Sequence, residues 1–331
     1  MAVSIEDIKK LRAMTGAGLA DVKKALTEAE GDFDKAKELL RERGLAIAAK
    51  RSDRETSNGC VLVKKVNDFA AIIALKCETD FVANGADFIK LTSDILDAAI
   101  AAKCHTLDEV KALALGESDV QAAVTHRSGI TGEKMELDGY NVLEGDNIEV
   151  YDHMNKHTLC TMVQLNENNE EAGHKVAMQV AAMRPVALDE SSVSEETKKT
   201  ELEVAVAKTK EELVEKAVNA ALKKAGINPA HVDSEEHIES NTKKGWLTPE
   251  QAEEARNIKK TVGEEKAATL NPTMIQNIAN GRLAKFFKEN CLVDQEFQFG
   301  DGDKQTVAQY LASQSKDLKI VAYQRFTLAA E

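Results

Sequence analysis

Histidine and cysteine are the residues of this chain best able to supply a nucleophile, a base or a metal ligand. Cys104 and His105 are adjacent, so their side chains diverge and form no nucleophile–base pair. His153 and His157 flank a predicted turn, but no third ligand stands at a useful spacing. Because a metal site needs three or four convergent ligands, we expect no metal site and no cofactor.

Two short motifs resemble ligand-binding loops but are incomplete. The Gly-Ala-Gly at residues 16–18 lacks the later glycine and lysine of a phosphate-binding loop. The Asp-Gly-Asp at residues 301–303 begins like a calcium loop, yet Thr306 replaces its central glycine and Ala312 its closing glutamate. The residues alone predict an interaction protein. An enzyme with an unrecognised site stays open as an alternative, since many active sites have no local signature.

Composition narrows the choice of partner. The 331 residues are 43% apolar and 30% charged, which is typical of globular proteins with a substantial core. A net charge of −13 disfavours direct binding of nucleic acid, because phosphate contacts need a basic surface. The longest apolar run, residues 69–75, is far shorter than the roughly 20 residues of a membrane span. We expect a cytoplasmic protein, away from membranes, with five reduced and buried cysteines.

The first 55 residues are predicted to form three short helices and a linker. Ser4 can cap the first helix, and the glycine-rich turn at residues 15–18 separates it from the second. Asp32 can cap the third helix, which we expect to end at Gly44. A helical unit of this size is typical of a docking module.

The rest of the chain is predicted to be an α+β core interrupted by helices. Two hairpin-plus-helix patterns indicate two subdomains with antiparallel sheets. Between them and the last strand lies an Ala-, Glu- and Lys-rich segment with a narrow apolar stripe, which predicts a helical coiled-coil hairpin. The stripe consists of Leu202, Val206, Leu213, Ala217 and Ala220. The predicted boundaries are 56–140 for the first subdomain, 141–193 for the start of the second, 194–270 for the hairpin and 271–331 for the return to the second subdomain.

Two longer motifs carry a resemblance to a known family. Residues 11–32 contain LRAMTGAG, DVKKAL and GD in that order, and residues 77–83 read CETDFVA. Together they resemble bacterial translation elongation factor Ts. Shorter similarities follow in LEGD at 143–146 and HKVAMQVAA at 174–182. The resemblance covers most of the chain apart from residues 205–270.

This resemblance implies a guanine-nucleotide exchange factor. Members of the family bind the GDP form of elongation factor Tu, speed GDP release and let GTP enter, without bond chemistry. The resemblance also implies a ubiquitin-associated-like N-terminal domain, a two-subdomain core and a helical hairpin. The family loop that enters the partner and dislodges its Mg²⁺ corresponds here to Thr79, Asp80, Phe81 and Val82.

The resemblance marks further residues as partner contacts. Arg12 and the positions of Leu19 and Ala20 dock the N-terminal domain, although relatives often have two methionines at the latter positions. Gln179 stands where some relatives have a partner-contacting histidine. Without the resemblance, Leu19 and Ala20 suggest helix packing and Phe81 a core residue on a helix face. Only the loop distinguishes an exchange factor from an adaptor that docks without affecting nucleotide.

Overall fold

The computed structural model describes residues 3–300 and 304–329, and it divides the chain into two compact units. The second unit is Val186–Gln295, and the rest of the chain forms the first. The segment predicted to form the helical hairpin, residues 194–270, lies within this second unit. The flanking segments pair with each other, since the Val186 N–H donates to the Asn290 carbonyl oxygen at 2.9 Å. The Asp-Gly-Asp predicted to form a turn at residues 301–303 lies outside the described residues.

Three helices open the first unit, as the sequence predicts. Ser4 and Asp7 form a reciprocal cap on the first helix, and Gly16 ends it with a φ of 68°. The apolar faces of the three helices meet in a small core that includes Leu11 and Val22. The helices are α1 (Ile5–Thr15), α2 (Leu19–Glu28) and α3 (Phe33–Lys50).

Gly44 does not end α3, contrary to the prediction. The helix continues to Lys50, and Gly44 lies against Gly129 of α7 (Val120–Thr131). A Cβ atom on Gly129 would lie only 2.2 Å from the Gly44 Cα. The two glycines therefore allow a backbone contact between α3 and α7, and this tertiary role replaces the helix-ending role that glycine commonly has.

A three-stranded antiparallel sheet forms the centre of the first unit, with strand order β1-β2-β5. The predicted hairpin is confirmed, because Val66 pairs with Phe69 across the turn. The predicted boundary at residue 140 is wrong, since it cuts through β5, which pairs with β2 along its length. The strands are β1 (Asn58–Val66), β2 (Phe69–Cys77) and β5 (Met135–Glu144), and a short pair, β3 (Ala114–Leu115) and β4 (Ser118–Asp119), lies apart.

A second antiparallel sheet has the order β6-β7-β8 and joins segments far apart in sequence. Its strands are β6 (Ile148–Asp152), β7 (Leu159–Leu165) and β8 (Ile320–Thr327). The helices of the first unit not yet described are α4 (Asp80–Ala83), α5 (Ala86–Ala101), α6 (Leu107–Lys111), α8 (Glu170–Met183) and α13 (Val307–Gln314). These elements form the mixed α+β core that the sequence predicts.

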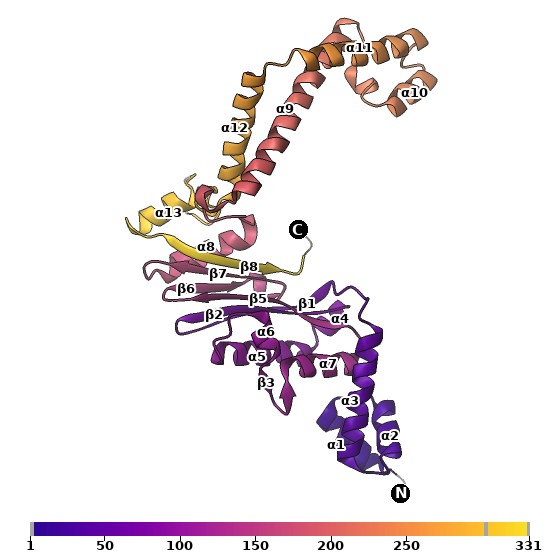
Figure 1. Ribbon diagram of the computed structural model, residues 1–331, viewed down its shortest axis with the longest axis vertical. Helices are drawn as coiled ribbons and strands as arrows, with labels where there is room; N and C mark the ends of the chain where they lie inside the picture. The colour runs from indigo at the N-terminus through magenta and orange to yellow at the C-terminus, as the bar shows by residue number, and fades with distance from the viewer. Residues whose placement is uncertain (1–2, 301–303, 330–331) are drawn as a thin grey trace. The chain divides into compact units, whose positions relative to one another are not determined.

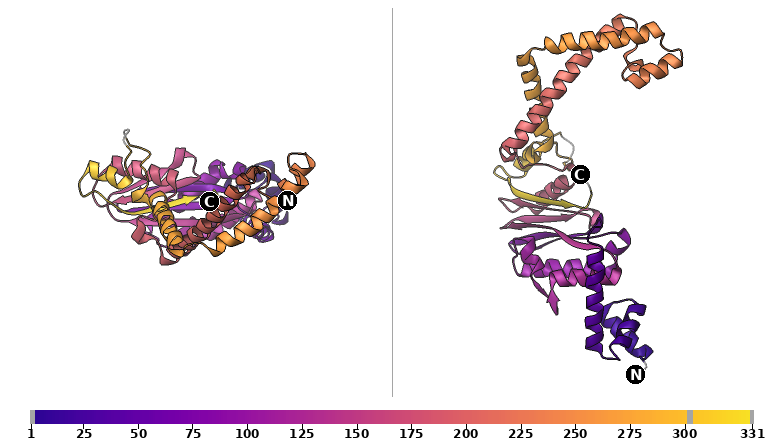
Figure 2. Two further views of the ribbon diagram at one scale, coloured as in Figure 1. Left: turned by 90° about the horizontal axis from the view of Figure 1, so that it is seen from above. Right: turned by 45° about the vertical axis from the view of Figure 1, so that its right-hand side comes forward.

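The two sheets stack face to face, with helices on the outside (Figures 1 and 2). Ile72 of β2 and Met162 of β7 belong to the core between the sheets. Phe69 and Ile73 point to the opposite face of β2, where they pack with Phe88 of α5. β2 is thus buried on both faces, which explains its unbroken run of apolar residues.

The second unit consists of helices α9 (Glu195–Lys224), α10 (Glu235–Lys243), α11 (Pro249–Ala268) and α12 (Pro272–Asn290). The predicted stripe on α9 is wrong, because its five residues are only half-buried or exposed. The buried positions are Ala205, Thr209, Val218 and Leu222. One straight stripe fails because α9 packs on both α11 and α12, so its buried face changes along its length.

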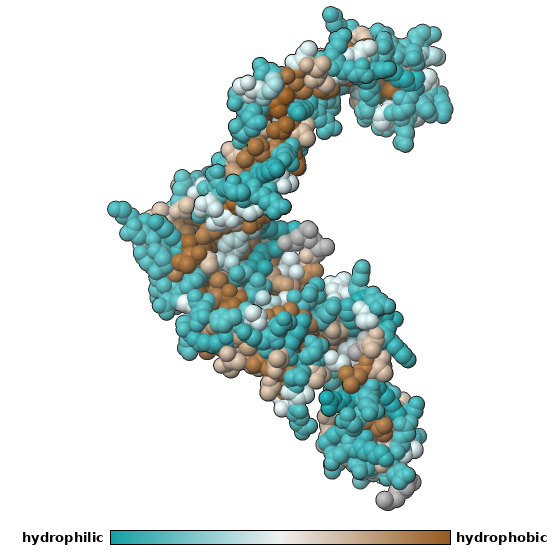
Figure 3. All heavy atoms as spheres, in the orientation of Figure 1, coloured by the Kyte–Doolittle hydropathy of each residue, from teal (hydrophilic) through white to brown (hydrophobic). Residues whose placement is uncertain are grey.

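Apolar surface remains exposed along these helices (Figure 3). A groove of about 770 Å³ between α9, α11 and the start of α12 is lined by apolar side chains that include Val206, Val214 and Ile275. Among the helices of residues 3–300 and 304–329, none combines the length and the apolar character needed to cross a bilayer.

The glycine contact between α3 and α7 gives a testable asymmetry. Gly129→Ala should lower the free energy of unfolding of the first unit by about 1–3 kcal/mol, because its new methyl group overlaps the Gly44 backbone. Gly44→Ala is the matched control, since its Cβ would lie 3.4 Å from the Gly129 Cα and should cost much less. Urea unfolding followed by amide exchange in α3 and α7 measures both losses. Equal losses would contradict the close approach.

Candidate functional site

The candidate site is the short loop that follows β2. Phe81, on the four-residue helix α4, is 89% exposed, the highest value for a large apolar side chain among the described residues. The interpretation of Phe81 as a core residue is therefore wrong. The chain turns at Asn84 and Gly85 between α4 and α5, so Phe81 does not continue the buried face of Phe88.

The loop has its own local stabilisation. Thr79 caps α4, and its hydroxyl accepts a hydrogen bond from the Val82 N–H at 3.4 Å. The Asn84 side-chain amide donates to the Asp80 carbonyl oxygen at 2.8 Å. Ala83 is buried in the core and Val82 packs against it. One side of the turn is thus anchored in the protein, while Phe81 points into solvent.

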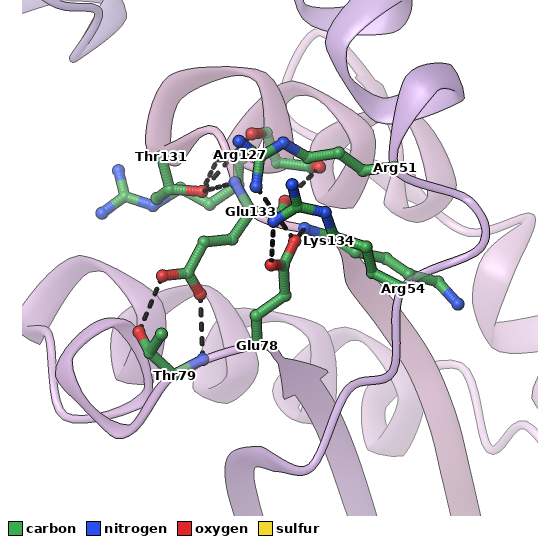
Figure 4. A network of polar contacts seen from close by, with 9 residues as sticks. Arg51, Arg54, Glu78, Thr79, Arg127, Thr131, Glu133 and Lys134 are labelled. Carbon is green, nitrogen blue, oxygen red and sulfur yellow. Dashed lines mark hydrogen bonds and ion pairs between the residues drawn. The ribbon is translucent and has the colours of Figure 1, made fainter.

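Glu133, from the segment between α7 and β5, holds the start of this loop (Figure 4). Its carboxylate accepts two hydrogen bonds from Thr79, one from the backbone N–H at 3.1 Å and one from the hydroxyl at 2.7 Å. On the other side of Thr79, the Cys77 thiol donates to the Thr79 carbonyl oxygen at 3.2 Å. Burial raises the pKa of Cys77 to about 12, so this thiol stays protonated and able to donate.

Glu78, immediately before the loop, joins three segments of the chain (Figure 4). Its carboxylate accepts from the Lys134 backbone N–H at 2.6 Å, and it pairs with Arg51 at 3.2 Å and Arg54 at 2.8 Å. The Lys134 hydrogen bond and the two guanidinium groups lower the pKa of Glu78 to about 2, outweighing the effect of burial. Both arginines follow directly after α3, so this ion cluster ties the N-terminal helices to the loop.

Asp80 presents a negative charge beside the exposed ring of Phe81. Its side chain is exposed, and within residues 3–300 and 304–329 no hydrogen bond or ion pair engages its carboxylate. A carboxylate and a phenyl ring at adjacent positions can act on a partner by binding, through charge and apolar contact. Within those same residues, no group of three or more His, Cys, Asp or Glu side chains could hold a metal ion.

The predicted docking residues of the N-terminal helices also lie on the surface. Arg12, Leu19 and Ala20 are exposed, and Leu19 is 56% exposed. The alternative interpretation of Leu19 and Ala20 as helix-packing residues is therefore wrong. Met14, two residues after Arg12, is a further exposed apolar side chain. The sequence analysis did not identify it.

Comparison with known proteins adds the family. A family model described as "Elongation factor TS" matches residues 78–330. The chain is 63% identical to elongation factor Ts of Bacteroides fragilis and 60% identical to that of Bacteroides thetaiotaomicron, over the full length of each chain. It is 39% identical to elongation factor Ts of Porphyromonas gingivalis, again over both full lengths.

The chain belongs to the elongation factor Ts family. This finding confirms the resemblance that the two sequence motifs indicate. The exposed loop at residues 79–82 belongs to one of the two motifs that carry this resemblance, and its Phe81 is the most exposed large apolar side chain among the described residues.

Gln179 differs from the other positions that the elongation factor Ts resemblance marks. It is fully buried in α8. Its side-chain amide donates to the Glu296 carbonyl oxygen at 3.1 Å, and its oxygen accepts from the Gln298 N–H at 3.0 Å. In this position Gln179 fastens residues 296–298 to α8, and its side chain lies below the surface of the chain. Its contact with a partner stays a prediction.

The pKa of Glu78 predicts how acid acts on the loop. A carboxyl group with a folded pKa of about 2, against an ordinary 4.5, stabilises the fold above pH 4.5. That contribution is lost as the pH falls from 4.5 towards 2. Stability measurements on Glu78→Gln and the unmodified chain should therefore differ most above pH 4.5 and converge in acid. A difference that stays constant with pH would contradict the ion cluster, and carbon-13 NMR titration of the Glu78 carboxyl measures its pKa directly.

Proposed function

We propose that this chain is the guanine-nucleotide exchange factor of elongation factor Tu. It binds the GDP-bound form, promotes release of GDP and allows GTP to bind. Family membership supports the activity, and the single structural observation that supports the mechanism is the 89% exposure of Phe81 on an anchored loop. The reaction breaks and forms no covalent bond, so the chain acts by binding and needs no cofactor of its own.

The loop is proposed to act on the Mg²⁺ that the partner holds with GDP. Mg²⁺ requires a nearly ideal octahedral shell of oxygen ligands and bridges protein to phosphate. A small displacement of those ligands or waters removes much of the attraction for GDP. Phe81 would enter an apolar pocket of the partner as a wedge, and the Asp80 carboxylate would lie near the elements that hold the metal shell. Thr79 and Val82 would form the edges of the same contact.

Energetics require a second contact surface. Accelerating release by roughly 10⁴-fold needs about 5.5 kcal/mol of differential stabilisation. Burying one phenylalanine side chain supplies at most about 1.5–3 kcal/mol. We propose that Arg12, Leu19 and Ala20 supply part of the rest, with residues 1–55 serving as a ubiquitin-associated-like docking domain. The helices of the second unit are proposed to pack as the coiled-coil hairpin of this family.

Binding and release are linked in both directions. Whatever weakens the affinity of the partner for GDP must be weakened equally by GDP, because coupling between two ligands is reciprocal. An incoming nucleotide therefore displaces the exchange factor, and one molecule can serve many partners.

Phe81→Ala tests the wedge. It should slow stimulated GDP release by about tenfold or more, in line with the loss of most of one buried phenylalanine. Its affinity for the GDP-bound form of elongation factor Tu should fall less, because the N-terminal helices still dock. The measurements are stopped-flow release of fluorescent GDP and calorimetric binding.

Val66→Ala provides the control, since Val66 is an exposed apolar side chain on the β1–β2 hairpin of the same unit. It should leave both quantities unchanged. Equal losses of rate and affinity in Phe81→Ala, or no loss at all, would contradict the wedge. Binding without any stimulation by the unmodified chain would favour an adaptor.

A further inference from the structure

We propose that Glu133 is a positioning residue for nucleotide exchange, which holds the loop at residues 79–82 in the shape that acts on the partner. This inference rests on the proposed exchange activity. It concerns a residue in a different part of the sequence from the loop motif, and one that need not touch the partner. Among the described residues, its carboxylate acts on the loop through hydrogen bonds to Thr79.

The geometry assigns Glu133 two tasks at once. One carboxylate oxygen accepts the Thr79 N–H, and the other accepts the Thr79 hydroxyl proton. Because that proton points to Glu133, the lone pairs of the hydroxyl remain free to accept from the Val82 N–H, which caps α4. A single carboxylate therefore fixes both the backbone and the capping rotamer of Thr79 (Figure 4).

Glu133 is itself held in place by the fold. Its N–H donates to the Thr131 hydroxyl at 3.2 Å, and its carbonyl oxygen accepts from the buried Ser128 hydroxyl. It follows Gly132, which ends α7 with a φ of 70°, and it precedes the first residue of β5 by two positions. Glu133 is therefore held between two regular elements, α7 and β5, and it can transmit their rigidity to the loop.

The loop needs such a support. A helix of four residues is far too short to be stable alone, because helix nucleation is unfavourable. Phe81 makes the loop harder to hold, since its exposed ring provides no anchor on this chain. A disordered loop would lose conformational entropy when it enters the partner, and that cost would fall on the exchange step. Initial docking through the N-terminal helices would be little affected.

Glu133→Ala removes both hydrogen bonds and leaves the motif intact. We expect stimulated GDP release to slow about tenfold, which is the effect of losing hydrogen bonds to a charged group near the surface. The affinity for the GDP-bound form of elongation factor Tu should change less than about threefold. Amide exchange at Thr79 and Val82 should speed up in the free chain, whereas amides in the middle of β2 should stay protected. Glu133→Gln keeps one oxygen for the Thr79 N–H, so its rate of GDP release should lie between those of Glu133→Ala and the unmodified chain.

Two further variants separate positioning from general destabilisation. Asp138→Ala is the matched control, because Asp138 is an acidic residue of β5 that pairs with Lys76 and does not contact the loop. It should leave exchange unchanged. Thr79→Val removes the hydroxyl that Glu133 orients. Combining it with Glu133→Ala should therefore slow release by less than the product of the two single effects.

The outcomes are distinguishable. Unchanged release or unchanged amide exchange at Thr79 in Glu133→Ala overturns the positioning role while the unmodified chain still accelerates GDP release. Multiplicative effects in the double variant overturn it as well. No acceleration by the unmodified chain overturns the proposed function, and this inference with it.

Discussion

The junction at Glu78 and Thr79 is the constraint on which the candidate site depends. The chain leaves the sheet here at the end of β2, and two carboxylates hold the junction. Glu78 binds the chain that arrives from the N-terminal helices, and the carboxylate of Glu133 binds Thr79. Segments separated by dozens of residues thus converge on two adjacent positions. The ordered conformation of the exposed loop depends on this convergence, because the four-residue helix at residues 80–83 is too short to be stable alone.

An exposed phenylalanine can contribute binding free energy when a partner buries it. Burying such a side chain yields about 1.5–3 kcal/mol, and this chain forgoes that gain in its free state. Holding the ring on an anchored turn means that the gain is realised on the partner and not through collapse onto the chain's own surface. The same anchor leaves the Asp80 carboxylate free to meet the partner. Rigidity of the support and exposure of the ring are therefore two parts of one arrangement.

The sequence predicted local features well and tertiary ones poorly. The caps of the N-terminal helices and the β1–β2 turn depend on neighbouring residues, and both are confirmed. Gly44 and the boundary placed at residue 140 depend on partners far along the chain, and both predictions are wrong. Phe81 could be placed outside the core only through the family resemblance. Nothing in the sequence pairs Glu133 with Thr79, since any of several acidic residues could have filled that role.

The most direct test of the account is release of fluorescent GDP from the cognate elongation factor Tu, chased with excess unlabelled nucleotide, at substoichiometric amounts of this chain. The account predicts that the whole population of GDP is released at the accelerated rate, because each molecule leaves its partner when nucleotide returns and acts again. Acceleration limited to one partner per molecule, or none despite demonstrated binding, would contradict it.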